Sequence, residues 1–332
     1  MGQWAVRYRS VTDQRPPAEP LPQRRPSSPD PDGAPGLPRR TAVSWRVGRH
    51  RSPHRLSVAS GAPALVLAVP GRGSRVDHDL VERIAEAASQ SCPGVDILVG
   101  YLSAGPDDYP AGAAGGYPPG TGGQPGAADG LAGAIASAPD HGSPAAPRAV
   151  VVPLLAGPHP VFDAEIGTTI GAADPPVMLA SHLGPHPLLA GALHDRLSEV
   201  GLARASRALG LNIAVGANGV LVVADRGPGA LSEAGLTTVL LAARLAVPTA
   251  HASLGDDESI RTAVSRLREA GASKIAISPC VIGPESRAAE FEQLSAALGM
   301  PCAPPLRDHP AVAQLVAARY GEALARISVP SH

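Results

Sequence analysis

The chain has 332 residues, a formal net charge of −1 at pH 7 and a mean hydropathy of +0.04. This length suits two domains of ordinary size, and residues 61–332 carry a net charge of about −8, which argues against a nucleic-acid-binding face. No apolar run reaches the roughly 18 residues that a membrane span needs, and the cysteines lack the CxxC spacing of a thiolate zinc site. We therefore expect a cytoplasmic protein with free thiols and no membrane partner.

The first sixty residues differ from the rest in composition. Residues 1–60 contain eleven arginines, four acidic residues and ten prolines, with little periodic apolar pattern. This composition predicts a disordered basic tail. A nucleic-acid-binding arm is the alternative, but the few aromatic residues here are scattered, which argues against base stacking. We therefore expect no nucleic-acid partner.

Short apolar runs alternate with helical patterns from residue 62 onward. In the first half, the predicted strands are 64–69, 95–102, 149–155 and 177–180, and the predicted helices include 75–90, 129–137 and 187–200. Residues 103–128 are rich in Gly, Pro and Ala and predict a low-complexity surface insertion. Alternation of this kind is typical of βαβ units and a parallel sheet.

The second half repeats the same layout. Its predicted strands are 219–224, 248–253 and 274–279, and its predicted helices are 230–245, 257–271, 285–298 and 309–327. Three short segments of the first half also recur in the same order in the second half. The pairs are Gly71–Ser74 with Asp225–Pro228, Leu154–His159 with Cys280–Glu285, and His182–Ala190 with Pro305–Ala313. The sequence therefore predicts a tandem duplication, with α/β domains at 61–205 and 211–330.

The turn Gly71–Arg75 follows the first predicted strand. Glycines at a strand-to-helix turn allow tight bends, and the amino end of the helix favours anions. Val76 stands where a GxGxxG fingerprint needs glycine, and no GK[ST] is present, so neither common nucleotide motif is met. A tight turn with solvated arginines and a carboxylate- or phosphate-binding turn both remain open.

A histidine follows the strand at 149–155. His159 comes after Gly157 and Pro158, so we expect its ring above the sheet edge rather than in the core. Asp163 lies one helical turn further, where a carboxylate can orient an imidazole that binds metal or accepts protons. A structural histidine is the alternative.

Other histidines have weaker signals. His186 and His309 each precede a proline at matching sites of the two halves, which predicts helix-start residues. His182 lies just past a predicted strand and is a candidate to line the same cleft as His159. His78 falls early in a predicted helix and is a candidate to lean toward that cleft.

From about residue 62 to 328 the chain resembles the sirohydrochlorin chelatase (CbiX-like) family, including its tandem-domain form. That family has a strand followed by Gly-His-Gly-Ser-Arg, a Pro-Leu-Leu strand leading to Gly-x-His-x-x-x-Asp, and a Leu-Gly-x-His-Pro-Leu-Leu segment. The matching segments here are Gly71–Arg75, Pro153–Asp163 and Leu183–Leu189. Their order adds specificity that no single motif has.

The resemblance implies two flavodoxin-like α/β domains, each a parallel sheet flanked by helices. It implies a lyase that inserts a divalent metal (Co²⁺, Fe²⁺ or Ni²⁺) as substrate into a reduced tetrapyrrole, sirohydrochlorin, on the path to sirohaem or cobalamin, with no organic cofactor. His159 would be the metal ligand and proton acceptor, with Asp163 supporting it. Arg72, Ser74 and Arg75 would hold the carboxylates of the tetrapyrrole.

One motif position departs from the family. Arg72 stands where the family has its first histidine, and a guanidinium neither ligates metal readily nor accepts a proton. Glu285 stands at the second-half position that matches His159. The alternative is therefore a chelatase relative with a degenerate site, which binds a tetrapyrrole or metal without catalysis. A phosphate- or nucleotide-binding α/β protein that uses the Gly71–Ser74 turn is a third interpretation.

Overall fold

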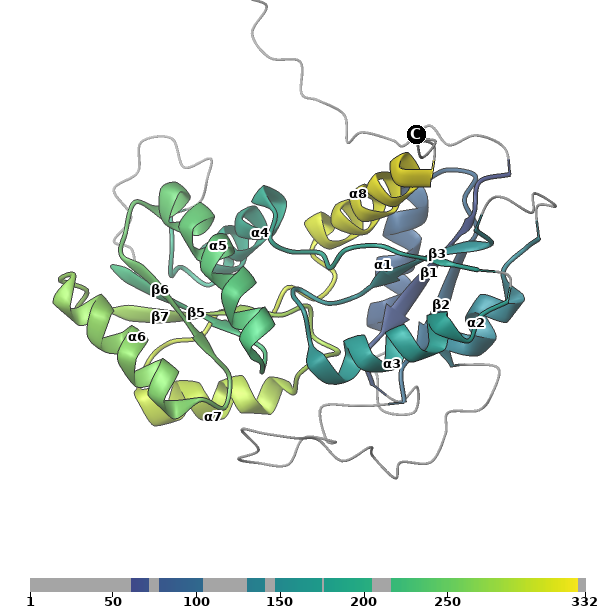
Figure 1. Ribbon diagram of the computed structural model, residues 1–332. Coiled ribbons are helices and arrows are strands. Elements are labelled where there is room, and N and C mark those ends of the chain that lie inside the picture. The colour runs from purple at the N-terminus through teal and green to yellow at the C-terminus, as the bar shows by residue number, and fades with distance from the viewer. Residues whose placement is uncertain are drawn as a thin grey trace, which may run out of the picture. The chain divides into compact units, whose positions relative to one another are not determined.

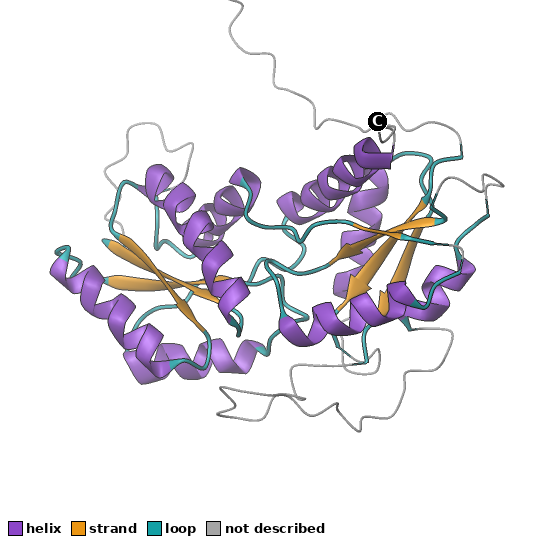
Figure 2. Cartoon of the chain, in the orientation of Figure 1, coloured by secondary structure: helices purple, strands orange, loops and turns teal. Residues whose placement is uncertain are grey.

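A computed structural model describes residues 61–71, 78–103, 130–140, 147–174, 176–204 and 216–327 (Figure 1). All of these belong to one compact unit, His50–His332. The predicted basic tail, nearly all of the predicted insertion and the turn residues Arg72, Ser74 and Arg75 lie outside the described part of the chain. Two parallel sheets with helices around them account for the described residues (Figure 2). This confirms the predicted α/β class.

The first sheet has the strand order β2-β1-β3-β4, and all its pairs are parallel. Its strands are β1 (Ala64–Val69), β2 (Ile97–Tyr101), β3 (Ala149–Pro153) and β4 (Met178–Leu179). Every residue of β1 and β3 is buried, as expected for apolar runs covered on both faces. Helices α2 (Leu131–Ser137) and α3 (Pro160–Gly171) cover one face, and α1 (His78–Ser91) packs on the other.

The second sheet has the order β6-β5-β7, also parallel. Its strands are β5 (Gly219–Ala224), β6 (Thr249–Ser253) and β7 (Ile275–Cys280). Helix α5 (Pro228–Leu245) packs on one face, and α6 (Asp257–Glu269) and α7 (Ala288–Leu298) pack on the other. Helix α7 begins at Ala288 rather than at residue 285, because the Glu285 carboxylate binds backbone amides of the turn after β7. None of the described helices combines the length and apolarity that crossing a membrane requires.

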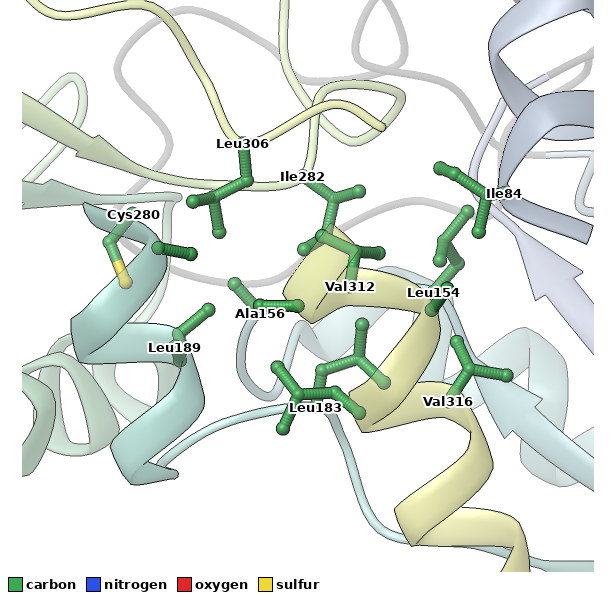
Figure 3. Close-up of a cluster of buried hydrophobic side chains, with 14 of the residues drawn as sticks. Ile84, Leu154, Ala156, Leu183, Leu189, Cys280, Ile282, Leu306, Val312 and Val316 are labelled. Carbon is green, nitrogen blue, oxygen red and sulfur yellow. The ribbon is translucent and has the colours of Figure 1, made fainter. Parts of the chain in front are cut away.

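The last helix of each half packs on the sheet of the other half. Helix α4 (Pro187–Glu199) contacts α5 and β7, whereas α8 (Pro310–Ile327) contacts α1 and β3. The two helices join the sheets into one apolar core, in which Leu189 of α4 and Val312 of α8 are buried together (Figure 3). The Tyr320 hydroxyl of α8 also donates a hydrogen bond to the Pro63 carbonyl at 2.6 Å. The residues around the predicted boundary, 205–215, lie outside the described part, so the boundary stays a prediction.

Candidate functional site

In the described part of the chain, three helices begin with the same dipeptide, histidine followed by proline. They are α3, α4 and α8, which begin after His159, His186 and His309. In each, Nδ1 of the histidine accepts a first-turn backbone N–H; the donors are Phe162 at 3.4 Å, Leu188 at 3.1 Å and Ala311 at 3.2 Å. Proline suits the first helical position, since no N–H is needed there, and the ring nitrogen acts as the N-cap. The prediction for His186 and His309 is confirmed, and His159 shares their geometry.

The ring of His159 is sealed inside the protein. It is 1% exposed and stacks on Phe162, with ring centroids 4.0 Å apart. The expectation of an open position above the sheet edge was therefore wrong. The cause is the turn after β5, which packs against the turn after β3. A Cβ added to Gly227 would lie 3.1 Å from Pro160, and one added to Gly229 would lie 3.0 Å from Pro158, so a larger residue at either position would push the two turns apart.

Two carboxylates of the second half share this buried region. Asp225 Oδ2 lies 3.6 Å from His159 Nε2, and Oδ1 lies 3.9 Å from the Arg226 guanidinium, which is beyond hydrogen-bond distance. The Glu285 carboxylate accepts backbone N–H groups from Ile282 and from Gly283, the latter at 2.7 Å. Asp225 and Glu285 are 7% and 2% exposed, so both carboxyl groups are almost completely shielded from solvent.

Burial controls the protonation of all three groups. Loss of solvent lowers the pKa of His159 to about 4, which outweighs the opposing effect of Asp163. Loss of solvent also raises the pKa of Asp225 to about 8, with a further contribution from Glu285, whose own pKa rises to about 7. The imidazole is therefore neutral at pH 7, and the Asp225 carboxyl is mostly protonated.

The space that these groups enclose is small. The cavity has a volume of about 10 Å³, which is room for one water molecule. Its lining includes the turn after β3, part of α5, and the side chains of Asp225, Cys280 and Glu285. Among the described residues, no three His, Cys, Asp or Glu side chains are arranged to hold a metal ion.

Asp163 links His159 to a second, more accessible histidine. Its Oδ2 accepts the backbone N–H of His159 at 2.9 Å, and its Oδ1 lies 2.8 Å from Nε2 of His182. The side chain of His182 is 20% exposed and that of Asp163 is 34% exposed. Asp163 therefore holds the backbone of His159 rather than its ring, contrary to the sequence-based expectation. The ring that it does orient belongs to His182.

Side chains from α5 and α8 complete this neighbourhood. Glu233 has one buried carboxylate oxygen without a hydrogen bond in the described residues, and burial raises its pKa, with His182 and Arg319 opposing the rise. Arg319 donates hydrogen bonds to the carbonyls of Leu183 at 3.1 Å and Pro185 at 3.4 Å. Helix α8 thereby fixes the loop that carries His182.

The chain is similar to solved structures but not to any protein-family model or curated sequence. Among solved structures, the chain is similar to the sirohydrochlorin chelatase SirB from Bacillus subtilis subspecies spizizenii in complex with cobalt, with a TM-score of 0.52 and 13% identity over 79% of this chain and 96% of that one. The chain has the chelatase fold. It is also similar to DR2241 from Deinococcus radiodurans, a multi-domain protein with structural similarity to chelatases, with a TM-score of 0.50 and 19% identity over 79% of this chain and 55% of that one.

The chelatase fold is the fold that the resemblance implied. The structure shows which of the predicted site residues meet. His159, Asp163 and His182 come together at the carboxyl ends of β3 and β4. His78 instead forms a 2.8 Å hydrogen bond with the hydroxyl of Tyr101.

Sequence reasoning missed Asp225, Glu233 and Arg319 as members of this region. For Asp225 a signal existed, since it begins the segment that matches the Gly71–Ser74 turn of the first half. Glu233 and Arg319 are single polar residues within helices, and no spacing pattern distinguishes them.

Proposed function

We propose that this protein binds a divalent metal ion and a reduced tetrapyrrole and inserts the ion into the ring. The observation that carries the proposal is the position of His159 on a chelatase fold, at the carboxyl end of β3 and 3.6 Å from the Asp225 carboxyl group of the other half. The cobalt in the similar SirB structure supports a divalent metal substrate here. Co²⁺, Fe²⁺ and Ni²⁺ are the candidate ions, and sirohydrochlorin is the candidate ring.

The chemistry suits a neutral imidazole. Two pyrrole N–H protons must leave as the ion enters, and an imidazole can accept a proton or ligate the ion. The low pKa of His159 keeps its ring neutral at pH 7. Its Nδ1 is engaged by the Phe162 N–H at 3.4 Å, which is a long hydrogen bond. Breaking this hydrogen bond therefore costs little free energy, and it frees the lone pair on Nδ1 of His159.

Insertion requires the site to open. A cavity of about 10 Å³ is far below the several hundred Å³ of a ligand pocket, so a tetrapyrrole does not fit the arrangement described above. The contact that must separate is the packing of Gly227 and Gly229 against Pro160 and Pro158. In the open form, Arg72, Ser74 and Arg75 are the candidates to hold carboxylates of the ring, as the motif implies.

A second candidate function is binding without catalysis. Two observations favour it: the His159 ring is 1% exposed, and Arg72 replaces the first motif histidine. In this alternative the protein is a tetrapyrrole- or metal-binding carrier, sensor or partner of an active chelatase.

One experiment separates the two candidates. Purified protein is mixed with sirohydrochlorin and Co²⁺ or Fe²⁺, and the absorbance of the ring is followed beside a His159→Ala variant. Chelatase activity predicts insertion by the wild type and a fall of about 10²-fold or more in the variant. Equal rates in the two proteins remove His159 from the mechanism. No insertion by the wild type, with insertion restored by Arg72→His, identifies a decayed enzyme.

A further inference from the structure

We propose that His182 is the second imidazole of this site, positioned by Asp163, and that it fills the role that Arg72 leaves open. This inference rests on the proposed function. It depends on three observations about His182: how its ring is held, how far it is exposed, and which elements surround it.

Only one nitrogen of the His182 ring has a hydrogen-bond partner among the described residues. Its Nε2 lies 2.8 Å from Asp163 Oδ1, and a carboxylate oxygen accepts, so Nε2 carries the ring proton. A neutral imidazole with its proton on Nε2 has a lone pair on Nδ1. Among the described residues, Nδ1 of His182 has no hydrogen-bond partner. A carboxylate that fixes one ring nitrogen and leaves the other available is the arrangement that prepares a histidine to ligate a metal or accept a proton.

His182 is also more accessible than His159. Its side chain is 20% exposed, whereas that of His159 is 1% exposed. The same carboxylate serves both residues, because Asp163 Oδ2 accepts the backbone N–H of His159 while Oδ1 binds the His182 ring. One side chain thus holds the backbone of His159 and the imidazole of His182, which follow neighbouring strands.

The surroundings of His182 come from both halves of the chain. Arg319 of α8 binds the carbonyls of Leu183 and Pro185, which limits the movement of the loop that carries His182. Glu233 of α5 places a buried carboxylate oxygen without a hydrogen bond close enough for His182 to affect its pKa. A cation or a protonated ring next to His182 would therefore meet a polar carboxyl group rather than an apolar wall.

The proton and electron balance of the proposed step is simple. One pyrrole N–H bond breaks, its electron pair stays on the pyrrole nitrogen, and that nitrogen binds the metal. The proton forms a new N–H bond at Nδ1 of His182 and passes from there to solvent. In the open form, a second pyrrole proton passes to Nδ1 of His159 once that nitrogen no longer accepts the Phe162 N–H. The dication replaces two protons, so charge is conserved and no oxidation state changes.

The test uses the full-length protein and compares His182→Ala, His182→Gln and Asp163→Asn with a matched control, His309→Asn. His309 caps α8 through its ring nitrogen, and asparagine also caps helices well, so the control removes an imidazole away from the site. Glutamine can keep the hydrogen bond to Asp163, which guards against misfolding of the alanine variant. Thermal unfolding checks that every variant is folded.

Two readouts are measured on each protein. The first is the initial rate of Co²⁺ insertion into sirohydrochlorin, and the second is the visible d–d spectrum of Co²⁺ added without a tetrapyrrole. We expect the His182 variants to insert about 10²-fold more slowly or worse. Asp163→Asn should lose about 10- to 100-fold, because an amide that donates to Nε2 moves the lone pair away from Nδ1. Added imidazole should raise the rate of His182→Ala, and the control should match the wild type.

The outcomes separate this inference from the proposed function. If the wild type inserts Co²⁺ and the His182 variants do so at the same rate, the inference is overturned and the proposed function stands. If the wild type inserts no metal, the proposed function fails and the d–d spectrum decides. Loss of the bound-ion bands in the His182 variants but not in the control then supports the inference. Unchanged bands, or none in the wild type, overturn it.

Discussion

The His159 ring and the Asp225 carboxylate come from opposite halves of the chain, yet Nε2 and Oδ2 lie 3.6 Å apart in the interior. The duplicated layout explains the meeting. His159 follows the third strand of the first sheet, Asp225 follows the first strand of the second sheet, and the intervening turns pack through glycines.

Replacement of the buried Asp225 should stabilise the protein at alkaline pH. Burial raises the pKa of Asp225 to about 8, above its unfolded value near 4. A group of this kind supports the fold in its protonated form, so its contribution is complete at low pH and is lost as the pH rises through about 8. We expect Asp225→Asn to gain roughly 1–3 kcal/mol over the wild type at pH 9 and much less at pH 5.

Urea unfolding at several pH values measures this difference. The matched control is Asp256→Asn, because Asp256 is an exposed N-cap that accepts backbone N–H groups from Glu258 and Ser259. Its variant should track the wild type at every pH. An Asp225→Asn protein that loses stability at pH 9 would show that the carboxylate has a partner that stabilises its charge.

The close packing of the two turns can be tested at Gly229. A Cβ at this position would lie 3.0 Å from Cβ of Pro158, and overpacking of this kind costs roughly 1–3 kcal/mol. We expect Gly229→Ala to lower the free energy of unfolding by that amount. Gly167→Ala in α3 is the control, because its added Cβ meets no atom within 4 Å. The control should gain roughly 0.5–1 kcal/mol from helix propensity, and equal effects of the two changes would contradict the packing.

Helices α4 and α8 each pack on the sheet of the other half, so we expect the two halves to depend on each other for folding. A fragment of residues 61–204 keeps the first sheet but lacks α8, which covers β3 and α1. We expect this fragment to be largely unfolded by circular dichroism and amide hydrogen exchange. Addition of a 205–332 fragment should restore protection in β1 and β3. A 61–204 fragment that folds alone would show that α8 is dispensable for the first sheet.

The histidine caps can be tested at His309. Its Nδ1 accepts the Ala311 N–H at 3.2 Å, so His309→Ala should cost about 1 kcal/mol of stability. His309→Asn should stay close to the wild type, because asparagine supplies another side-chain acceptor. Chemical denaturation of the two variants checks the difference, and equal losses would argue that the ring matters through packing instead.

Local patterns predicted most of the strands and helices. Continuous apolar runs between glycine and proline turns located β1, β3 and β5, because a strand buried on both faces must be apolar throughout. The His-Pro dipeptides located the starts of α4 and α8 for an equally local reason. The partners of His159 were not local, because Asp225 is more than sixty residues away along the chain.

By itself the sequence determined the α/β class, the parallel order that alternating strands and helices imply, and the likeness to chelatases. These depend on periodicity and short motifs, which act over a few residues. Tertiary structure alone decided that α4 and α8 each pack on the sheet of the other half, that His159 is buried against the second half, and that Asp163 orients His182. Burial and pairing are set by whichever distant segments pack together, and a pattern along one chain does not encode that choice.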